Sequence, residues 1–405
     1  MSNSFRIYLP LALFFYLLNA LPAGAQQPKT ILPLGPYLQI RDGLNHSAMV
    51  FNEQRKATVA FLGGSITFGT GWRDSICAYL SDRYPLVKFH FIAAGIPSLG
   101  SLPHAFRLQR DVLDSGVVDL LFIETAVNDR VNLTDSLTQV RALEGIVRHA
   151  RKANPKIDMV LMSFADPSKT ADYQRHIVPA EIANHEMIAG YYRLPSINLA
   201  KQVHDQVANG EYSWENDFKD LHPSPFGHEV YFRTMKKLLD SSLQLPSLQK
   251  NRVRQMPKPI DPHNLANGRY YAITNASHDA GWRLIRDWTP DNDISTRAGF
   301  VHQDMLVSVV PSSEATLHFS GTAVGIAIVS GPDAGFISYS IDGRPFKMKD
   351  LYTEWSAGLY LPWYILFDSA LAPGRHILKI RTVEKKNDLS KGNACRIVYF
   401  LVNGK

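Results

Sequence analysis

The sequence predicts two folded parts: a parallel α/β sheet with helices on both faces, followed by an all-β sandwich. Between residues 57 and 245, short β-branched runs alternate five times with longer amphipathic stretches, which is typical of a parallel sheet. Beyond residue 262 the apolar residues recur with a period of two between turn signals, which indicates antiparallel strands. The chain has 405 residues, 45% hydrophobic and 20% charged, and is long enough for two globular domains.

In the α/β region the elements are expected in strict alternation. Strands are predicted at residues 58–62, 87–93, 120–125, 157–164 and 196–198. Helices are predicted at residues 72–81, 102–113, 136–153, 180–190 and 225–243. Parallel sheets of this kind bind ligands beyond the carboxyl ends of their strands, so we expect the functional residues in the loops there.

Changes in composition along the chain predict its division. Residues 1–25 resemble a secretory signal peptide, because Arg6 precedes an apolar run and Ala23 and Ala25 fit a cleavage site. Residues 26–55 are an N-terminal extension, 56–245 the α/β domain, 246–262 a linker rich in proline and basic residues, and 263–405 the β-sandwich. The mature protein is therefore expected to be exported, to the periplasm or outside the cell, without a stable membrane insertion.

The net charge and the number of cysteines indicate which classes of binding partner are excluded and what stabilises the fold. The net charge of +6 comes from 43 basic and 37 acidic residues without a long basic block, which does not indicate nucleic-acid binding. Cys77 and Cys395 lie in different predicted domains, and two separate buried thiols are favoured over a bridge between them. The domains must then be stabilised by their apolar cores.

The first predicted strand ends in Gly63-Gly64-Ser65. A serine flanked by glycines fits a tight turn that exposes its hydroxyl, and its own backbone N–H can point at a substrate carbonyl. A phosphate-binding glycine loop is the alternative, but the spacing matches neither the P-loop nor the dinucleotide motif. Ser65 is therefore a candidate nucleophile.

The next two strand ends carry candidate oxyanion donors. Gly95 follows the second strand and Asn128 the third, so the Gly95 N–H and the Asn128 amide can converge beside Ser65. Taken singly, Gly95 fits an ordinary turn, and Asn128-Asp129 fits a helix N-cap. Their order at successive strand ends favours a shared site.

His222 lies in the loop before the last predicted helix and is the candidate base for Ser65. Pro223 and Pro225 restrict this loop, whereas His228 is expected on the helix itself. A metal site formed by the two histidines with Asp217 and Asp220 is disfavoured, because such a site would need three converging ligands. Paired-carboxylate glycosidase chemistry at Glu124 and Asp129 is also disfavoured, relative to a buried hydrogen bond and a capping role.

Together these motifs resemble four blocks of the SGNH (GDSL-like) hydrolase superfamily, over about residues 56–245. The matching segments are Gly63-Gly64-Ser65-Ile66-Thr67, Gly95, Ala126-Val127-Asn128-Asp129 and His222-Pro223. The resemblance implies a three-layer flavodoxin-like fold that uses no metal and no organic cofactor. It also implies Ser65 as nucleophile, Ser65, Gly95 and Asn128 as the oxyanion hole, and His222 as base.

One position departs from the family pattern. The triad aspartate usually stands three residues before the histidine, where this chain has Lys219. Asp220 is the preferred partner of His222, while Asp217 and a Ser-His dyad oriented by a backbone carbonyl stay open. Because the carboxylate fixes the imidazole tautomer, its absence would slow the reaction without changing its class.

The predicted activity is hydrolysis of O-acyl esters on carbohydrate, with acetyl preferred because no extended apolar lid segment is visible. The C-terminal region also resembles jelly-roll accessory domains of carbohydrate esterases. Aromatic residues that could stack on sugars, or instead fill its core, are Trp282, Trp288, Tyr339, Tyr352, Trp355, Tyr360, Trp363 and Tyr364. A lipid or thioester acyl hydrolase, a non-catalytic glycan-binding protein and an acyltransferase are the alternatives.

Overall fold

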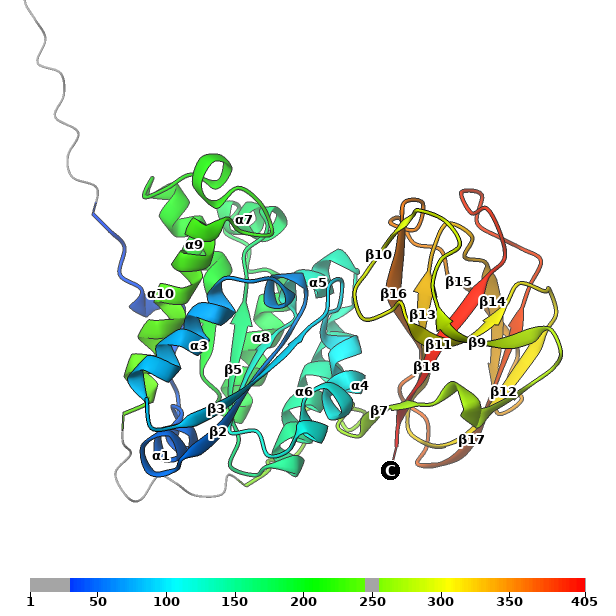
Figure 1. Ribbon diagram of the computed structural model, residues 1–405, viewed down its shortest axis with the longest axis horizontal. Helices are drawn as coiled ribbons and strands as arrows, with labels where there is room; N and C mark the ends of the chain where they lie inside the picture. Colours follow the sequence, from blue (N-terminus) through cyan, green and yellow to red (C-terminus); the bar gives the residue numbers. More distant parts are fainter. Residues whose placement is uncertain (1–29, 245–254, 405) are drawn as a thin grey trace, which may run out of the picture.

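The computed structural model describes residues 30–244 and 255–404. Figure 1 shows two domains side by side, the α/β domain on the left and the β-rich domain on the right. The predicted signal peptide, residues 1–25, lies outside the described residues.

A six-stranded sheet with the order β1-β6-β5-β4-β2-β3 forms the centre of the first domain. Its strands are β1 Leu38–Gln39, β2 Lys56–Gly63, β3 Lys88–Gly95, β4 Leu120–Glu124, β5 Asp158–Ser163 and β6 Ser196–Asn198. Strands β2 to β6 run parallel to their neighbours, and β1 is antiparallel to β6. All five predicted strands are present, and β4 and β5 are buried along their whole length because helices cover both faces.

Helices cover the two faces of this sheet. They are α1 Asn45–Glu53, α2 Ser65–Phe68, α3 Trp72–Arg83, α4 Ser101–Asp111, α5 Ala126–Val131, α6 Ser136–Ala153, α7 Pro167–Gln174, α8 Ala180–Tyr192, α9 Leu199–Ala208 and α10 Pro225–Ser242. One apolar core lies under α1, α3, α9 and α10, and the other under α4, α6 and α8. The predicted three-layer α/β/α arrangement is therefore confirmed.

The five predicted helices correspond to α3, α4, α6, α8 and α10, and the sequence analysis missed five shorter ones. Two of the missed helices begin at clear side-chain caps. The Asp166 side chain accepts from Lys169 N at the start of α7, and Asn198 accepts from Lys201 N at the start of α9. With only 8 and 10 residues, these helices carry too short an apolar pattern to stand out.

The segment predicted as an N-terminal extension packs onto the α/β domain. Leu38 and Gln39 pair with β6, and Phe51 of α1 is buried in the core that lies under α3 and α10. The Asp158 carboxylate also accepts a hydrogen bond of 2.8 Å from Ser47 N. Residues before 56 thus contribute both a strand and a helix to this domain.

The end of the predicted linker is held against α6. The Glu144 carboxylate accepts hydrogen bonds from the backbone N–H groups of Ile260 and Asp261, at 2.6 and 2.9 Å. Asp261 also forms an ion pair of 2.9 Å with Arg141. The earlier linker residues, 245–254, lie outside the described residues.

Two sheets form the C-terminal domain, with the orders β10-β16-β13-β18-β11-β9, to which β7 adds beside β18, and β15-β14-β17-β12-β8. Their strands are β7 Gly268–Tyr271, β8 Ala276–His278, β9 Trp282–Trp288, β10 Ser295–Thr296, β11 Gln303–Ser308, β12 Glu314–Gly321, β13 Val324–Ser330, β14 Phe336–Ile341, β15 Lys347–Asp350, β16 Leu359–Asp368, β17 Gly374–Thr382 and β18 Cys395–Asn403. The pairing is antiparallel except between β10 and β16. Apolar side chains of both sheets share one core, as predicted for a β-sandwich.

Most of the aromatic rings singled out in this domain contribute to packing. Trp282, Trp288 and Tyr360 are only 2%, 7% and 3% exposed, whereas Trp355 is 45% exposed. The remaining four are half-buried. Cys77 and Cys395 are both free thiols, as predicted, but only Cys395 is buried as expected, whereas Cys77 is half-buried.

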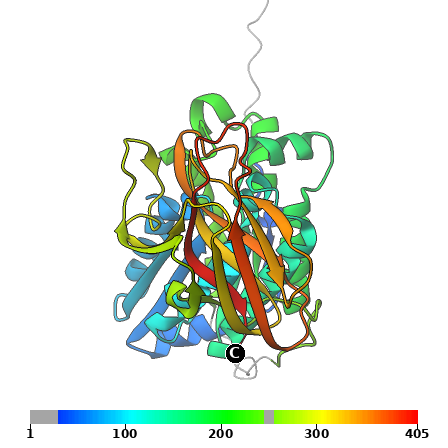
Figure 2. The same ribbon diagram turned by 90° about the vertical axis from the view of Figure 1, so that its right-hand side faces the viewer.

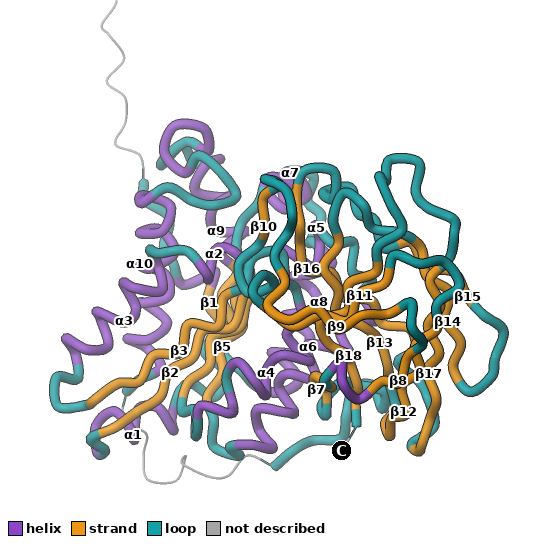
Figure 3. The backbone as a smooth tube through the Cα atoms, turned by 45° about the vertical axis from the view of Figure 1, so that its right-hand side comes forward, coloured by secondary structure: helices purple, strands orange, loops and turns teal. Residues whose placement is uncertain are grey.

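The two domains share a continuous apolar contact, and Figure 2 shows the β-rich domain in front of the α/β domain. Ala327 and Leu401 of the sandwich belong to the same buried cluster as the α4 and α6 side chains. Arg110 of α4 donates a hydrogen bond of 2.7 Å to the Tyr399 hydroxyl, and its guanidinium lies 4.8 Å from the Tyr270 ring centroid. Figure 1 shows β10 on the side of the sandwich that faces α5, and Figure 3 shows α4 beside β7 and β18 of the sandwich.

Within residues 30–244 and 255–404, none of the helices combines the length and the apolar character of a membrane span.

Candidate active site

Ser65 is the first residue of α2, directly after the glycines that end β2. Its hydroxyl Oγ lies 2.8 Å from Nε2 of His222, which belongs to the loop before α10. The two residues are 157 positions apart in the chain. Ser65 is half-buried and His222 exposed, so the pair lies at the solvent boundary. This is the distance expected between a nucleophilic hydroxyl and its general base.

The glycines beside Ser65 bring the other predicted residues close to it. A Cβ atom on Gly64 would collide with the side-chain nitrogen of Asn128, so this amide lies against the backbone beside Ser65. A Cβ on Gly95 would collide with the backbone of Phe68, because β3 ends directly against α2. The structure therefore gathers Ser65, Gly95, Asn128 and His222 at one edge of the sheet.

Asp129 is buried beside Asn128 and links two of these loops. Its carboxylate accepts hydrogen bonds from Ser101 N at 2.8 Å and from Ser101 Oγ at 2.9 Å. The other carboxylate oxygen accepts from Thr125 Oγ1 at 2.9 Å. Ser101 is the first residue of α4, so Asp129 caps a helix other than its own. Asn132 strengthens the link by donating a hydrogen bond of 2.9 Å to Ser98 O.

Burial shifts the titration of several groups below the site. It raises the pKa of Glu124 to about 7. The hydrogen bond that the Glu124 carboxylate accepts from Val127 N acts in the opposite direction. Burial also raises the pKa of Asp129 to about 6. His185 is buried next to Thr125 Oγ1, at 2.8 Å, and burial lowers its pKa to about 3. The hydrogen bond of Glu124 confirms the structural role predicted for it.

Residues 61–230 match the GDSL-like Lipase/Acylhydrolase family. This match lies within the α/β domain, which therefore carries a GDSL-like acylhydrolase domain match. The resemblance to SGNH (GDSL-like) hydrolases noted in the sequence is thus confirmed, and the residues matched run from the end of β2 into the first part of α10.

Two solved structures are similar over both domains of the chain. They are crystal structures of a two-domain esterase (CEX) active on acetylated mannans, one of them co-crystallized with mannopentaose. Their identities are 19% and 18%, with TM-scores of 0.71 and 0.73, and each comparison covers 90% of this chain and 98% of the other. No curated protein matches the sequence significantly. At these identities, the similarity shows a shared two-domain fold.

The acylhydrolase domain does not bring Asp220 to the histidine ring. Among the described residues, no hydrogen bond joins His222 to Asp220 or to Asp217. The Asp217 carboxylate accepts from Ser213 N at 2.7 Å, and Asp220 is exposed. Asp220 as the triad acid therefore stays a prediction without a contact that supports it. The Ser-His dyad oriented by a backbone carbonyl also stays a prediction, because the only hydrogen bond of the His222 ring to a described residue is the one with Ser65.

His228 lies on α10, as expected, and its ring bonds to the start of α3. Its Nδ1 atom accepts a hydrogen bond of 3.3 Å from Trp72 N, which connects α10 with α3. Burial is the main cause that lowers the pKa of His228. Gly71, with φ of 131°, leaves room for this ring, because a Cβ atom there would collide with it.

The sequence analysis missed the polar residues that support the site. Ser101 bonds to Asp129 and Thr125 bonds to His185 only in the folded chain, at separations of 28 and 60 residues along the sequence. Lys169 is also buried and forms an ion pair with Asp166 behind the carboxyl end of β5. Only Asp166 gave a local signal, because it precedes Pro167 at the start of α7.

Proposed function

We propose that this protein is an exported serine esterase that hydrolyses O-acyl esters, above all O-acetyl esters, on carbohydrate. The observation that carries the proposal is the 2.8 Å separation of Ser65 Oγ and His222 Nε2 in a GDSL-like acylhydrolase domain. An exposed histidine and a half-buried serine at the solvent boundary suit a bulky, hydrated substrate.

In the first half of the reaction, His222 Nε2 accepts the Ser65 proton while Oγ attacks the ester carbonyl carbon. The backbone N–H groups of Ser65 and Gly95 and the Asn128 amide stabilise the oxyanion. The tetrahedral intermediate collapses when protonated His222 passes its proton to the leaving sugar hydroxyl. Ser65 then carries the acyl group as an ester.

Water completes the cycle by the same route. His222 accepts a proton from the water molecule, whose oxygen attacks the acyl carbon and forms a second tetrahedral intermediate. Collapse of this intermediate returns the proton to Ser65 Oγ and releases the carboxylic acid. No oxidant, metal or organic cofactor enters this sequence of steps.

The two-domain architecture supports a carbohydrate as the carrier of the ester. Over 90% of the chain, the fold is similar to that of the esterase active on acetylated mannans, including its second domain. A long-chain lipid would instead need an extended apolar channel at the nucleophile. Acetyl is therefore the proposed acyl group, and the sugar-bearing hydroxyl is the proposed leaving group.

Acetate release from acetylated mannan, xylan and pectin tests the proposal, with Ser65→Ala as the inactive control. A fluorophosphonate probe should label the wild-type protein at Ser65 and leave Ser65→Ala unlabelled. Activity that rises with nitrophenyl esters beyond butyrate would favour a lipid or thioester acyl hydrolase. Absence of labelling and of acetate release together would favour a non-catalytic glycan-binding protein.

A further inference from the structure

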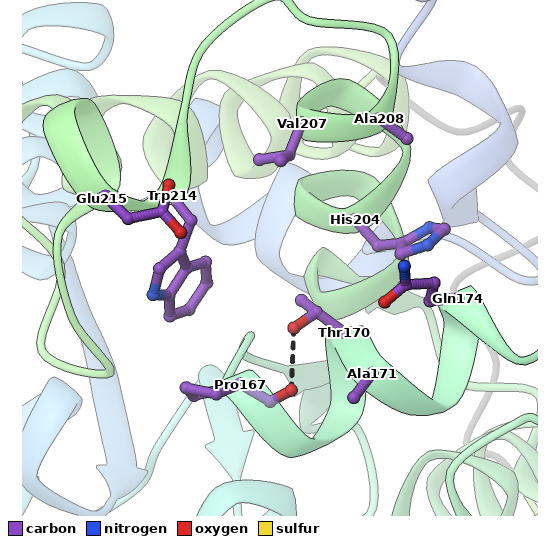
Figure 4. A pocket seen from close by; sticks show the side chains of 9 residues that line it. All are labelled: Pro167, Thr170, Ala171, Gln174, His204, Val207, Ala208, Trp214 and Glu215. Carbon is purple, nitrogen blue, oxygen red and sulfur yellow. Dashed lines mark hydrogen bonds between the residues drawn. The ribbon is translucent and has the colours of Figure 1, made fainter.

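A pocket of about 410 Å³ opens between α7, α9 and the π-helical turn Trp214–Phe218, and Ser65 is not among the residues that line it (Figure 4). The turn contributes Trp214 and Glu215, α7 contributes Thr170 and Gln174, and α9 contributes His204. This volume lies in the range of pockets that hold small molecules. The catalytic mechanism uses none of these side chains.

The pocket and Ser65 lie at the same edge of the sheet. Helix α7 follows β5, β5 neighbours β4, and β4 neighbours β2, which ends beside Ser65. Two strand spacings correspond to roughly 10 Å across the sheet. A chain of linked sugars bound at Ser65 can therefore extend over the rim towards the pocket.

The wall that carries Trp214 is attached to the loop that carries His222. Ser224 N donates a hydrogen bond of 3.0 Å to Phe218 O. The Ser224 hydroxyl donates to Asp217 O in the same turn. Ser224 also caps α10 and stands two residues after His222. The pocket and the base are thus held by one short segment.

The residues that line the pocket suit both the apolar face and the hydroxyl groups of a pyranose ring. Phe218 stacks on the indole of Trp214, with a centroid distance of 4.9 Å, and Figure 4 shows this indole directed across the pocket towards Pro167 and Thr170. Aromatic rings pack well on the apolar face of a sugar. Amide and carboxylate groups of Gln174 and Glu215, both exposed, are available to the hydroxyl groups at its rim.

Charge distinguishes between classes of sugar. The nine described residues that line the pocket include the carboxylate of Glu215 and no lysine or arginine. A uronate ring would bring its own carboxylate close to Glu215 without a lysine or arginine of the lining to compensate, and the lining His204 already faces the Asp205 carboxylate at 3.0 Å. A neutral hexose or pentose has no such cost.

We propose that this pocket is a distal subsite for a neutral pyranose unit of the same polysaccharide whose acyl ester is cleaved at Ser65. The inference rests on the proposed esterase function and adds the class of the sugar chain. It assigns Trp214 as the stacking platform and Gln174 as a hydrogen-bonding side chain of the subsite.

The test compares Trp214→Ala, Gln174→Ala and wild-type protein on acetylated manno-oligosaccharides and on 4-nitrophenyl acetate. We expect the kcat/KM for the oligosaccharide to fall by about tenfold more than that for the small ester, mainly through KM. Trp214→Phe should recover part of the loss. Leu137→Ala, which truncates a 53% exposed side chain on α6, is the control and should match wild type on both substrates.

Binding separates failure of the subsite from failure of the esterase proposal. Calorimetry with deacetylated manno-oligosaccharide and Ser65→Ala protein should detect binding that Ser65→Ala/Gln174→Ala weakens. The subsite proposal would be overturned if Gln174→Ala lost kcat/KM equally on both substrates. It would also be overturned if Ser65→Ala/Gln174→Ala bound the oligosaccharide as tightly as Ser65→Ala. A change in nitrophenyl-ester chain-length preference would identify an acyl pocket instead, and stronger binding of oligogalacturonate would refute the neutral class.

Discussion

The carboxylate of Asp129 accepts hydrogen bonds from both the backbone N–H and the hydroxyl of Ser101, at 2.8 and 2.9 Å. Asp129 follows the oxyanion-donor candidate Asn128, and Ser101 begins the helix that follows the Gly95 loop. The pair therefore fixes the position of one donor relative to the other. Electrostatic stabilisation of an oxyanion depends on such preorganisation, because the donors must be in place before charge develops.

Asp129→Ala is expected to reduce kcat by about 100-fold, because a small displacement of Asn128 relative to Gly95 misaligns the oxyanion donors. Each buried donor left without an acceptor should also lower the free energy of unfolding by about 1–3 kcal/mol. Asp129→Asn keeps one acceptor oxygen and should lose less. Steady-state kinetics and urea unfolding of the two variants measure both effects. A wild-type kcat in Asp129→Ala would contradict a positioning role.

Glu124 should make stability depend on pH. Burial raises its pKa from 4.5 to about 7, so the folded state binds a proton that the unfolded chain releases at lower pH. The protonated Glu124 carboxyl thus contributes to the free energy of unfolding. This contribution is fully present below about pH 4.5 and is lost as the pH rises through about 7, with a total of about 3 kcal/mol at most. In Glu124→Gln this dependence disappears, while an amide oxygen can still accept from Val127 N.

Urea unfolding of Glu124→Gln and wild-type protein between pH 5 and pH 8 measures this contribution. The free energy of unfolding of the variant should rise relative to wild type as the pH increases, because only wild type loses stability in this way. Asp129 and His185 are present in both proteins, so their own titrations largely cancel in the difference. A difference independent of pH would mean that Glu124 titrates at its ordinary pKa.

Local patterns predicted the architecture well, because each strand and each long helix buries its own apolar face. Helix α6, for example, spans Ser136–Ala153 as expected, with an Asp135 cap and a continuous buried stripe. The glycines next to Ser65 also carried a local steric signal. Such features depend on residues close together in the chain, which is why the sequence alone reveals them.

Contacts between segments that are distant in the sequence could not be predicted from such local patterns. Thr125 and His185 are ordinary polar residues in the sequence, and only the packing of α8 beside α5 makes them partners. The loop before His222 is another case, because Lys219 has a φ of 78°, a conformation that non-glycine residues seldom adopt. The chain turns sharply there, so the spacing between Asp220 and His222 did not predict where the carboxylate points.

Asn128→Ala should retain the fold and lose most of the activity. Removing one oxyanion donor typically reduces kcat by about 100-fold to 1000-fold. The Asn128 side chain lies against Gly64, so its truncation leaves the glycine turn and the Ser65–His222 contact intact. Fluorophosphonate labelling and thermal unfolding should therefore change much less than kcat. A kcat within threefold of wild type would exclude Asn128 as a donor.

Asp220→Asn and Asp217→Asn decide how His222 is oriented. Where a triad aspartate holds the catalytic histidine, replacing it by asparagine lowers kcat by about 10⁴-fold. Because Asp217 accepts from Ser213 N and Asp220 is exposed, we expect each variant to stay within about fivefold of wild type, as a Ser-His dyad requires. His222→Ala, by contrast, should reduce kcat to the level of Ser65→Ala. A loss of three or more orders of magnitude in Asp220→Asn would show that this carboxylate reaches the imidazole in the working enzyme and would restore the Ser-His-Asp triad.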